Sequence, residues 1–257
     1  MPHDPSSAPS WPGAVRRAAL DALAVVVPVA CAGCGRPDRS VCPACLVALR
    51  PVPRVAQRAT VAAWAALEYA DVVAKVVGAY KDGSRTDTAA PLAAALAASV
   101  VAALAGSPAG SVEACTVPST RAAMRRRGYA PVDVLLAGCG IRPSRVLRPT
   151  RAREDQAGLD ADARRLNAAG ALTARGDLRG RRFLLVDDIL TTGSTLAEAA
   201  RAVVAGGGSV AAAAVLAETP LRHSGRLAAS QETHRDIPFE GGYGGRTGVV
   251  VPPFGSG

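Results

Sequence analysis

Two adjacent carboxylates, Asp187 and Asp188, come directly after a short apolar run, and a loop rich in hydroxyl groups follows them. The run 183–186 is too short for a helix and is flanked by charge, which indicates a strand buried on both faces, as in a parallel sheet. The loop 191–195 leads into 196–204, which has the pattern of a helix. We therefore expect both acids at the carboxyl end of a strand, where open α/β sheets bind their ligands.

The chemistry of this stretch suits a phosphorylated sugar. The first amides of a helix have no intrahelical partner and lie at the positive end of its dipole, so they can receive a phosphate. Gly193 lets the backbone approach closely, and Thr191, Thr192, Ser194 and Thr195 add hydroxyl donors. The two acids suit a ligand with vicinal hydroxyls, a divalent cation, or both. The alternative is an ordinary buried strand and a well-capped helix, since Thr and Ser are good N-caps.

The ordered run from the apolar strand through 191–195 resembles the phosphoribosyl-pyrophosphate (PRPP) signature of type I phosphoribosyltransferases. The resemblance implies an α/β fold with a central parallel sheet, flanking helices and a hood. It also implies that Asp187 and Asp188 hold the ribose 2′- and 3′-hydroxyls while 191–195 wraps the 5′-phosphate. The loop is not a Walker A motif, because no Gly-Lys-Ser/Thr is present.

Further phosphate contacts are predicted elsewhere. The predicted strand 112–117 is followed by small residues and a guanidinium, namely Pro118, Ser119, Thr120 and Arg121. Ser119, Thr120 and backbone amides could face a pyrophosphate, and Arg121 could clamp it through two hydrogen bonds. Lys81, beside a Gly turn, could also reach a phosphate or could be an ordinary solvated charge.

A second kind of chemistry is indicated near the N-terminus. Two Cys-x-x-Cys pairs stand seven residues apart, namely Cys31, Cys34, Cys42 and Cys45. This spacing is typical of a tetrahedral Cys₄ site for structural zinc, which leaves no open coordination position for catalysis. Disulfides are the alternative, and they need an oxidising compartment. Cys115 and Cys139 lie in apolar contexts and are expected in the core.

Positive charge is concentrated in one part of the chain. The net charge is +9, and 121–153 contains nine arginines and one acid, Asp133. Such an excess indicates an anionic partner, either a polyphosphate ligand or nucleic acid, unless it is simply a solvated surface. A groove for single-stranded DNA normally adds aromatic stacking platforms. Tyr129 is the only aromatic residue in this stretch.

From about 20 to 218 the order of the motifs resembles the competence protein F (ComF) family. The matching positions are the four cysteines of the two pairs, Lys81, Pro118, Arg121, Arg127, Gly128, Gln156, Leu159, Arg164 or Arg165, Asn167 and 187–195. One departure is 129–131, Tyr-Ala-Pro, where the family usually has Phe-Asn-Gln. The resemblance implies Mg²⁺-dependent displacement of pyrophosphate from PRPP, with Asp187, Asp188 and Arg121 as catalytic residues. It also implies a link to DNA uptake, with single-stranded DNA or an uptake protein as a partner.

The sequence predicts a disordered leader over 1–14, a helix and zinc module over 15–53, the phosphoribosyltransferase-like domain over 54–220, and a disordered tail over 221–257. The charged segment 150–171 is expected to cover the site as the hood. The oligomeric state stays open.

Local patterns predict helices over 61–69, 72–80, 91–104 and 131–136, and strands over 144–147 and 209–216. An apolar run at 18–30 imitates an export signal, but Asp21 and Pro28 interrupt it. No run of about 18–20 apolar residues stands out, so we expect a cytoplasmic protein without a membrane span.

Overall fold

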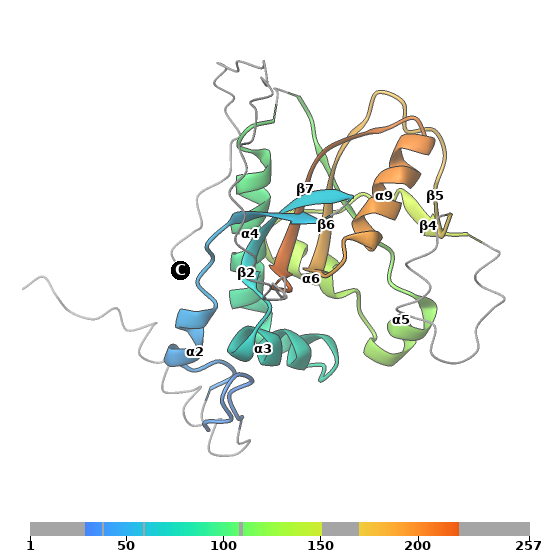
Figure 1. The fold of residues 1–257 in the computed structure, drawn as a ribbon. Helices are drawn as coiled ribbons and strands as arrows, with labels where there is room; N and C mark the ends of the chain where they lie inside the picture. Colours follow the sequence, from blue (N-terminus) through green and yellow to red (C-terminus); the bar gives the residue numbers. More distant parts are fainter. Residues whose placement is uncertain (1–28, 38, 59, 108–109, 151–169, 221–257) are drawn as a thin grey trace, which may run out of the picture.

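The computed structural model describes residues 29–37, 39–58, 60–107, 110–150 and 170–220 (Figure 1). The predicted leader, the predicted helix over 15–27, nearly all of the predicted hood and the predicted tail lie outside the described residues. The predicted domain boundaries therefore stay predictions.

A five-stranded sheet forms the centre of the molecule, in the order β1-β2-β7-β6-β3. Its strands are β1 (Arg54–Arg58), β2 (Val61–Glu68), β3 (Glu113–Thr116), β6 (Arg182–Leu190) and β7 (Ser209–Glu218). Only the β1–β2 pair is antiparallel, while β2–β7, β7–β6 and β6–β3 are parallel. The central parallel sheet expected from the sequence is confirmed.

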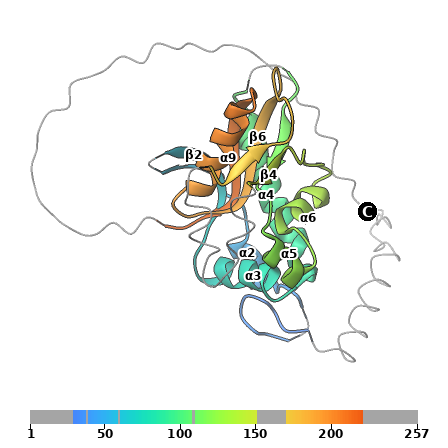
Figure 2. The same ribbon diagram turned by 90° about the vertical axis from the view of Figure 1, so that its right-hand side faces the viewer.

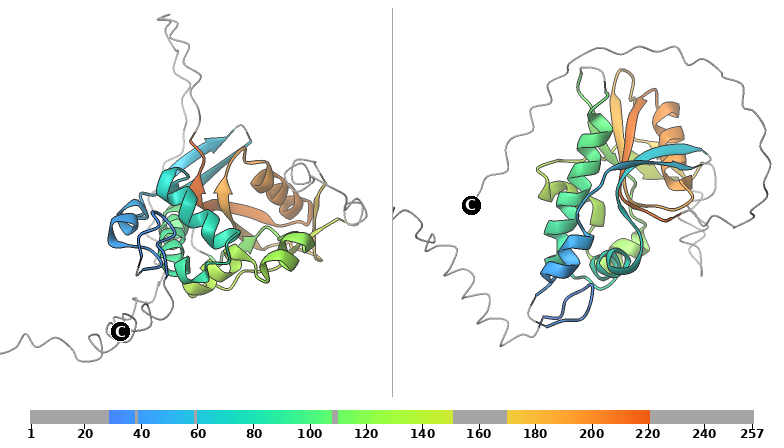
Figure 3. Two further views of the ribbon diagram at one scale, coloured as in Figure 1. Left: turned by 90° about the horizontal axis from the view of Figure 1, so that it is seen from below. Right: turned by 60° about the vertical axis from the view of Figure 1, so that its left-hand side comes forward.

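Helices cover both faces of this sheet. One face carries α3 (Asp71–Lys81), α4 (Ala89–Leu104) and α6 (Pro131–Gly138), and the other carries α9 (Ser194–Ala205). Figure 1 shows α4 and α9 on opposite sides of β6 and β7, and Figure 3 shows the same layers from two further directions. The remaining elements are short: α2 (Pro43–Ala48), η1 (Thr86–Thr88), α5 (Arg121–Arg127), and a two-stranded sheet of β4 (Leu147–Pro149) with β5 (Leu172–Ala174).

The strand that precedes the two acids is buried on both faces, as predicted. Phe183, Leu184, Leu185 and Val186 are each at most 1% exposed. Strand β6 continues past Asp187 and Asp188 to Leu190, because its register with β7 extends that far. The carboxylates are therefore attached to the last part of a central strand, which fixes their backbone.

The predicted helix over 61–69 is wrong, because this segment is strand β2. Alanine favours helices, but intrinsic propensity is a weak guide when a segment lies between two strands. Strand β2 pairs with β1 on one side and with β7 on the other. The strand predicted over 144–147 is also shifted, since β4 begins at Leu147 and pairs with β5 outside the main sheet. The strands over 112–117 and 209–216, and the helices over 72–80, 91–104, 131–136 and 196–204, are confirmed.

One helix is long and apolar enough to cross a membrane by length and composition alone, over Thr86–Leu104. Most of this run is α4, and seven of its side chains are buried, including Leu92 and Leu96. These side chains pack in the same core cluster as residues of β2, β7 and α6. Helix α4 thus has the position of a core helix of the α/β domain.

Candidate functional site: a four-cysteine cluster and a cavity at the strand ends

The four cysteines of the two Cys-x-x-Cys pairs converge. The sulfur atoms of Cys31, Cys34, Cys42 and Cys45 all lie within 4.8 Å of one another, and the Sγ atoms of Cys34 and Cys42 are 3.6 Å apart. A tetrahedral zinc ion with Zn–S bonds of about 2.3 Å needs sulfur atoms roughly 3.8 Å apart. The spacing fits, and the cluster could bind zinc.

Backbone amides lower the thiol pKa of Cys31 and Cys42, whereas burial raises the pKa of Cys45 to about 12. A thiolate is the form that binds metal. Burial raises the pKa of the Cys31 thiol, but amide donors of Cys42, Cys34 and Gly33 outweigh this effect and bring the pKa to about 6. The Cys42 amide lies 3.3 Å from Cys31 Sγ. Gly33 is tightly enclosed, since an added Cβ would lie 2.7 Å from Cys45 Sγ and 3.0 Å from Val72 Cγ1 on α3. The cluster therefore packs directly against α3.

The second candidate site is a cavity of about 370 Å³ at the carboxyl ends of β3 and β6. It is lined by Lys81, Val117, Pro118, Ser119, Thr120, Ala123, Arg126, Arg127, Ala130, Pro131, Val132, Asp133, Asp187, Asp188, Ile189, Thr191 and Thr195. Part of this lining comes from α5, on the side that faces the viewer in Figure 2. Segments far apart in the sequence thus meet because two neighbouring parallel strands end at the same edge.

The two acids differ in their electrostatic environment. Burial and the neighbouring charge of Asp188 raise the pKa of Asp187 to about 7, although the Asp188 amide and Lys81 act in the opposite direction. The Asp188 amide donates to Asp187 Oδ1 at 2.9 Å. The Lys81 ammonium, on the last residue of α3, lies 2.7 Å from Asp188 Oδ2. The cavity therefore holds one ion-paired carboxylate and one that binds its proton more tightly than an ordinary aspartate.

The loop 191–195 contains a glycine with a positive φ angle that packs closely against a neighbouring strand. Gly193 has φ +82°, a value that favours glycine, and it is the N-cap residue of α9. An added Cβ would lie 2.5 Å from Val61 Cγ1. The hydroxyls of Thr192 and Ser194 lie 3.0 Å apart. Both the dihedral angle and the packing thus explain why glycine stands at this position.

The predicted pyrophosphate loop borders the same cavity as the two acids. Pro118, Ser119 and Thr120 line the cavity, and the Thr120 hydroxyl caps α5 by accepting from the Ala123 amide at 3.1 Å. Arg121, predicted to clamp the pyrophosphate, is exposed at the start of α5 and is not among the described residues that line the cavity. The lining guanidiniums are those of Arg126 and Arg127, five and six residues further along α5.

Arg127 has a partly unsatisfied guanidinium. Its Nη2 donates to Asp82 Oδ1 at 3.0 Å, whereas its Nε is buried without a hydrogen-bond partner among the described residues. A buried donor without an acceptor is costly, and such groups are often completed by a ligand. The side chain as a whole is 16% exposed and lines the cavity.

The structure brings together most of the predicted PRPP-site residues: Lys81, Pro118, Ser119, Thr120, Asp187, Asp188, Thr191 and Thr195. Thr192, Gly193 and Ser194 belong to the same loop but are not among the lining residues. Sequence reasoning gave no site role to Arg126, Arg127 or Asp133, although Arg127 stood among the positions of the family resemblance. The run of three arginines before Gly128 was a signal for the first two, whereas Asp133 lies on the predicted helix over 131–136 without a motif of its own.

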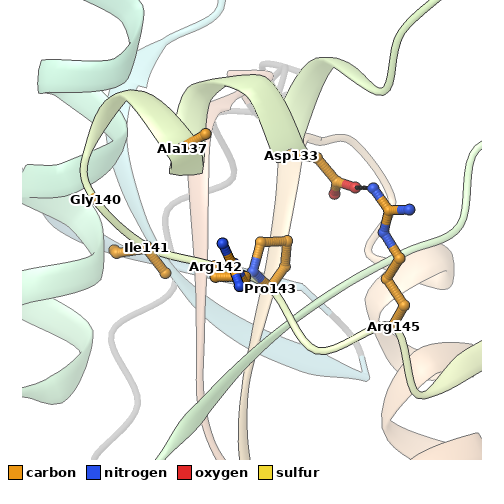
Figure 4. A pocket seen from close by; sticks show the side chains of 7 residues that line it. All are labelled: Asp133, Ala137, Gly140, Ile141, Arg142, Pro143 and Arg145. Carbon is orange, nitrogen blue, oxygen red and sulfur yellow. Dashed lines mark hydrogen bonds and ion pairs between the residues drawn. The ribbon is translucent and has the colours of Figure 1, made fainter.

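Asp133 also borders a second hollow of about 740 Å³, lined by Ala137, Gly140, Ile141, Arg142, Pro143 and Arg145. Asp133 and Arg145 face each other at one side of it (Figure 4), with Arg145 Nη2 3.1 Å from Asp133 Oδ2. The other carboxylate oxygen accepts from the Thr116 hydroxyl at the end of β3, at 2.8 Å. This carboxylate is thus held by partners from two elements and separates the two hollows.

Comparison with known protein families supports a phosphoribosyltransferase-type domain. Residues 126–233 match the model of the phosphoribosyl transferase domain. The matched part includes β6, the loop 191–195, α9 and β7, and it begins after Pro118 and Arg121. No curated protein matches the chain. Match and topology support the expected fold, an α/β phosphoribosyltransferase domain with a mostly parallel central sheet, preceded by a four-cysteine cluster.

Proposed function

We propose that the chain binds PRPP with Mg²⁺ and transfers its phosphoribosyl group to an acceptor, releasing pyrophosphate. The observation that carries this proposal is the composition of one cavity. It combines two acids, a loop leading into a helix N-terminus, and a second loop followed by two arginines. These are the groups required by ribose hydroxyls, a terminal phosphate and a pyrophosphate, respectively.

In this proposal each part of PRPP has its own partners. Asp187 and Asp188 accept hydrogen bonds from the ribose 2′- and 3′-hydroxyls, and 191–195 surrounds the 5′-phosphate. Ser119 and Thr120 face the pyrophosphate together with Arg126 and Arg127. Lys81, now paired with Asp188, lies close enough to the acids to exchange that partner for a phosphate oxygen.

The reaction breaks the bond between ribose C1 and the pyrophosphate oxygen, and that oxygen leaves with the electron pair. A lone pair of the acceptor forms the new bond to C1. When bound, Mg²⁺ would neutralise negative charge on the leaving pyrophosphate. The carboxylates of Asp187 and Asp188 stabilise positive charge that develops on the ribosyl ring, and the guanidiniums of Arg126 and Arg127 stabilise the departing pyrophosphate. Carboxylate and phosphate oxygens suit Mg²⁺, so the residues present fit this ion.

The resemblance to the ComF family supports a protein of that type in the cytoplasm, linked to DNA uptake. Binding of single-stranded DNA at 121–153 has weaker support. The Tyr129 ring packs against Tyr80, with centroids 5.7 Å apart, and its hydroxyl donates to the Tyr80 carbonyl. A ring held in this way is a poor stacking platform for a base. The pyrophosphate interpretation therefore accounts better for the arginines of α5.

The proposal is tested by calorimetric titration of Mg-PRPP into the wild type, the double variant Asp187→Asn/Asp188→Asn, and Asp177→Asn as a control. Asp177 precedes β6 and is exposed away from the cavity. We expect the double variant to lose binding at least about a hundredfold, because two charge-assisted hydrogen bonds disappear, and the control to bind like the wild type. A pyrophosphate-release assay with a panel of bases then tests turnover.

Two outcomes would change this conclusion. A wild-type protein that does not bind Mg-PRPP contradicts the proposal. Binding that depends on Asp187 and Asp188 without pyrophosphate release for any acceptor in the panel favours a non-catalytic PRPP sensor instead.

A further inference from the structure

Arg58 is buried directly beside the loop 191–195. It is the last residue of β1 and is only 7% exposed. It belongs neither to the PRPP signature nor to the part of the chain that matches the phosphoribosyl transferase domain. We propose that Arg58 is a positioning residue that holds 191–195 in the shape that receives the 5′-phosphate. This inference rests on the proposed function for the identity of the ligand.

Every nitrogen of the guanidinium is used. Nε donates to the Thr191 carbonyl at 2.6 Å, and Nη2 donates to the Thr219 carbonyl at 2.7 Å. Nη1 donates to the Gln57 carbonyl at 2.9 Å. Thr191 follows the end of β6 and Thr219 follows the end of β7. One side chain therefore connects the β1–β2 hairpin to the ends of both central strands.

The charge of Arg58 is compensated inside the protein. Its Nη2 lies 3.2 Å from Glu218 Oε2, and Glu218 is itself only 8% exposed. The other oxygen of Glu218 accepts from Arg54 Nε at 2.7 Å. A buried guanidinium is tolerated only when it is paired and hydrogen-bonded in this way. The pairing fixes the direction in which Nε points, which is toward the Thr191 carbonyl.

This contact determines how the loop presents itself to an anion. In a trans peptide the carbonyl and the following amide point in opposite directions. Because Arg58 holds the Thr191 carbonyl, the Thr192 amide points away from Arg58. Within the described residues the amides of Thr192 and Gly193 donate no hydrogen bond. The Thr191 carbonyl, which would repel an anion, is thus held by Arg58, and the amides of Thr192 and Gly193 are left to donate to the phosphate.

Packing supports the same role. A Cβ at Gly193 would lie 2.5 Å from Val61 Cγ1 and 3.2 Å from Arg58 Cβ. The hairpin therefore touches the loop backbone itself. Arg58 is not among the described residues that line the cavity, so its effect on a ligand must pass through the loop rather than through direct contact.

The test compares Arg58→Met with Arg54→Met. Arg54 is the matched control, because it lies on the same strand and pairs with the same Glu218, while its guanidinium bonds within the described residues go to Glu68 and Glu218 rather than to 191–195. Binding of Mg-PRPP, ribose 5-phosphate and pyrophosphate is measured by calorimetry for each protein. We expect Arg58→Met to weaken Mg-PRPP and ribose 5-phosphate by about tenfold to a hundredfold, since a charge-assisted hydrogen bond that orients the loop is lost. Pyrophosphate binding should stay unchanged, and Arg54→Met should match the wild type for all three ligands.

A second measurement keeps the inference testable whatever the ligand is. Hydrogen exchange of the Ala197 amide, which donates to the Gly193 carbonyl at 2.9 Å, should accelerate in Arg58→Met and stay unchanged in Arg54→Met. Arg58→Lys, which keeps the charge but loses the planar donor geometry, should give an intermediate effect on both readouts. If Arg58→Met does not fold because Glu218 is left buried without its partner, the double variant Arg58→Met/Glu218→Gln also removes that buried charge and is measured in place of Arg58→Met.

The outcomes separate the two proposals. A wild type that binds neither Mg-PRPP nor ribose 5-phosphate overturns the proposed function, while faster exchange of the Ala197 amide in Arg58→Met would still support the positioning role. A wild type that binds both ligands, with Arg58→Met equal to it in affinity and exchange, overturns the inference. An equal loss of affinity for ribose 5-phosphate and for pyrophosphate would also overturn it, since that pattern indicates general destabilisation.

Discussion

In the four-cysteine cluster the ligand atoms already lie within 4.8 Å of one another, and three of the four residues are buried. In the strand-end cavity, by contrast, the polar and charged side chains line a volume of about 370 Å³. One of its two carboxylates is paired with Lys81, while the pKa of the other is raised to about 7 by burial and by its neighbour. The cluster is closed around a space of atomic size, whereas the cavity is open and electrostatically incomplete.

This difference indicates different uses. A closed set of four ligands can hold a metal for stability but leaves no position for a substrate. An open site that holds a carboxylate with a raised pKa costs stability, and a bound ligand can offset that cost. The two regions are connected, because the cluster packs on Val72 of α3, and the same helix ends in Lys81.

The largest effect is expected at the cluster. Cys42→Ser removes a buried ligand that is 1% exposed, so zinc content should fall from about one ion per chain to nearly none, because a Cys₄ site requires four thiolates. The unfolding transition should also move to lower temperature. Metal analysis and thermal unfolding measure both effects. Cys139→Ser is the control, since this cysteine lies outside the cluster. Zinc content that does not change in Cys42→Ser would show that the cluster is not a metal site.

At the open site, Gly193→Ala should be the most damaging single change. Gly193 and Gly140 have similar positive φ values of +82° and +72°, but only Gly193 lacks space for a Cβ. Gly140→Ala should cost about 1 kcal/mol from backbone conformation alone. Gly193→Ala should cost about 2–4 kcal/mol, since the clash with Val61 Cγ1 is added. Chemical denaturation measures both values, and equal costs would mean that the hairpin does not constrain the loop.

Sequence patterns predicted the two regions unequally, for physical reasons. The spacing of the four cysteines was sufficient for the cluster, because all ligands lie within 15 residues of chain. The two acids and 191–195 also lie close together in the sequence, so one continuous motif predicted them. By contrast, the contribution of Arg126, Arg127 and Asp133 depends on the parallel pairing of β3 with β6. Arg58 could not be predicted, because it meets Thr191 across 133 residues.

The misassigned segment 61–69 shows the same limit. Its four alanines and its leucine suit a helix as well as a strand, and only its place between β1 and β7 decides for the strand. Since Val61 belongs to this strand and packs on Gly193, the error concealed the contact between the strand and 191–195. Local propensity predicted most elements of the sheet, but not the long-range contacts that hold the site together.

A smaller effect is expected from Asp187→Asn, and it should be stabilising. The folded-state pKa of Asp187 is raised to about 7, above about 3.9 in the unfolded chain. The folded state therefore binds the extra proton, and stability falls as pH rises from about 4 to about 7. The variant should gain on the order of 2 kcal/mol at pH 8 relative to the wild type, little at pH 4, and lose affinity for Mg-PRPP. Denaturation at both pH values, with Asp177→Asn as control, measures this. A variant less stable than the wild type at pH 8 would mean that Asp187 is not electrostatically strained.

The smallest effect is expected at Glu113, a carboxylate whose partners are complete. Arg181 donates to both of its oxygens, at 2.8 and 2.7 Å. Hydrogen bonds from Arg181 and Ser144 lower the pKa of Glu113 to about 2. The sign is opposite to that of Asp187: the stabilisation is present above about pH 4.3, the unfolded value, and is lost as pH falls toward 2. Glu113→Gln should cost at most about 1 kcal/mol at pH 7, because the pair is partly exposed.

The cost of Glu113→Gln should disappear near pH 2, where the wild type has lost the same charge. Acid titration of stability, with the exposed Glu68→Gln as control, measures this. If Glu113→Gln and Asp187→Asn changed stability in the same direction at neutral pH, the contrast between satisfied and incomplete carboxylates would fail. Opposite signs would instead locate the stored electrostatic cost at the strand-end cavity, where a ligand can relieve it.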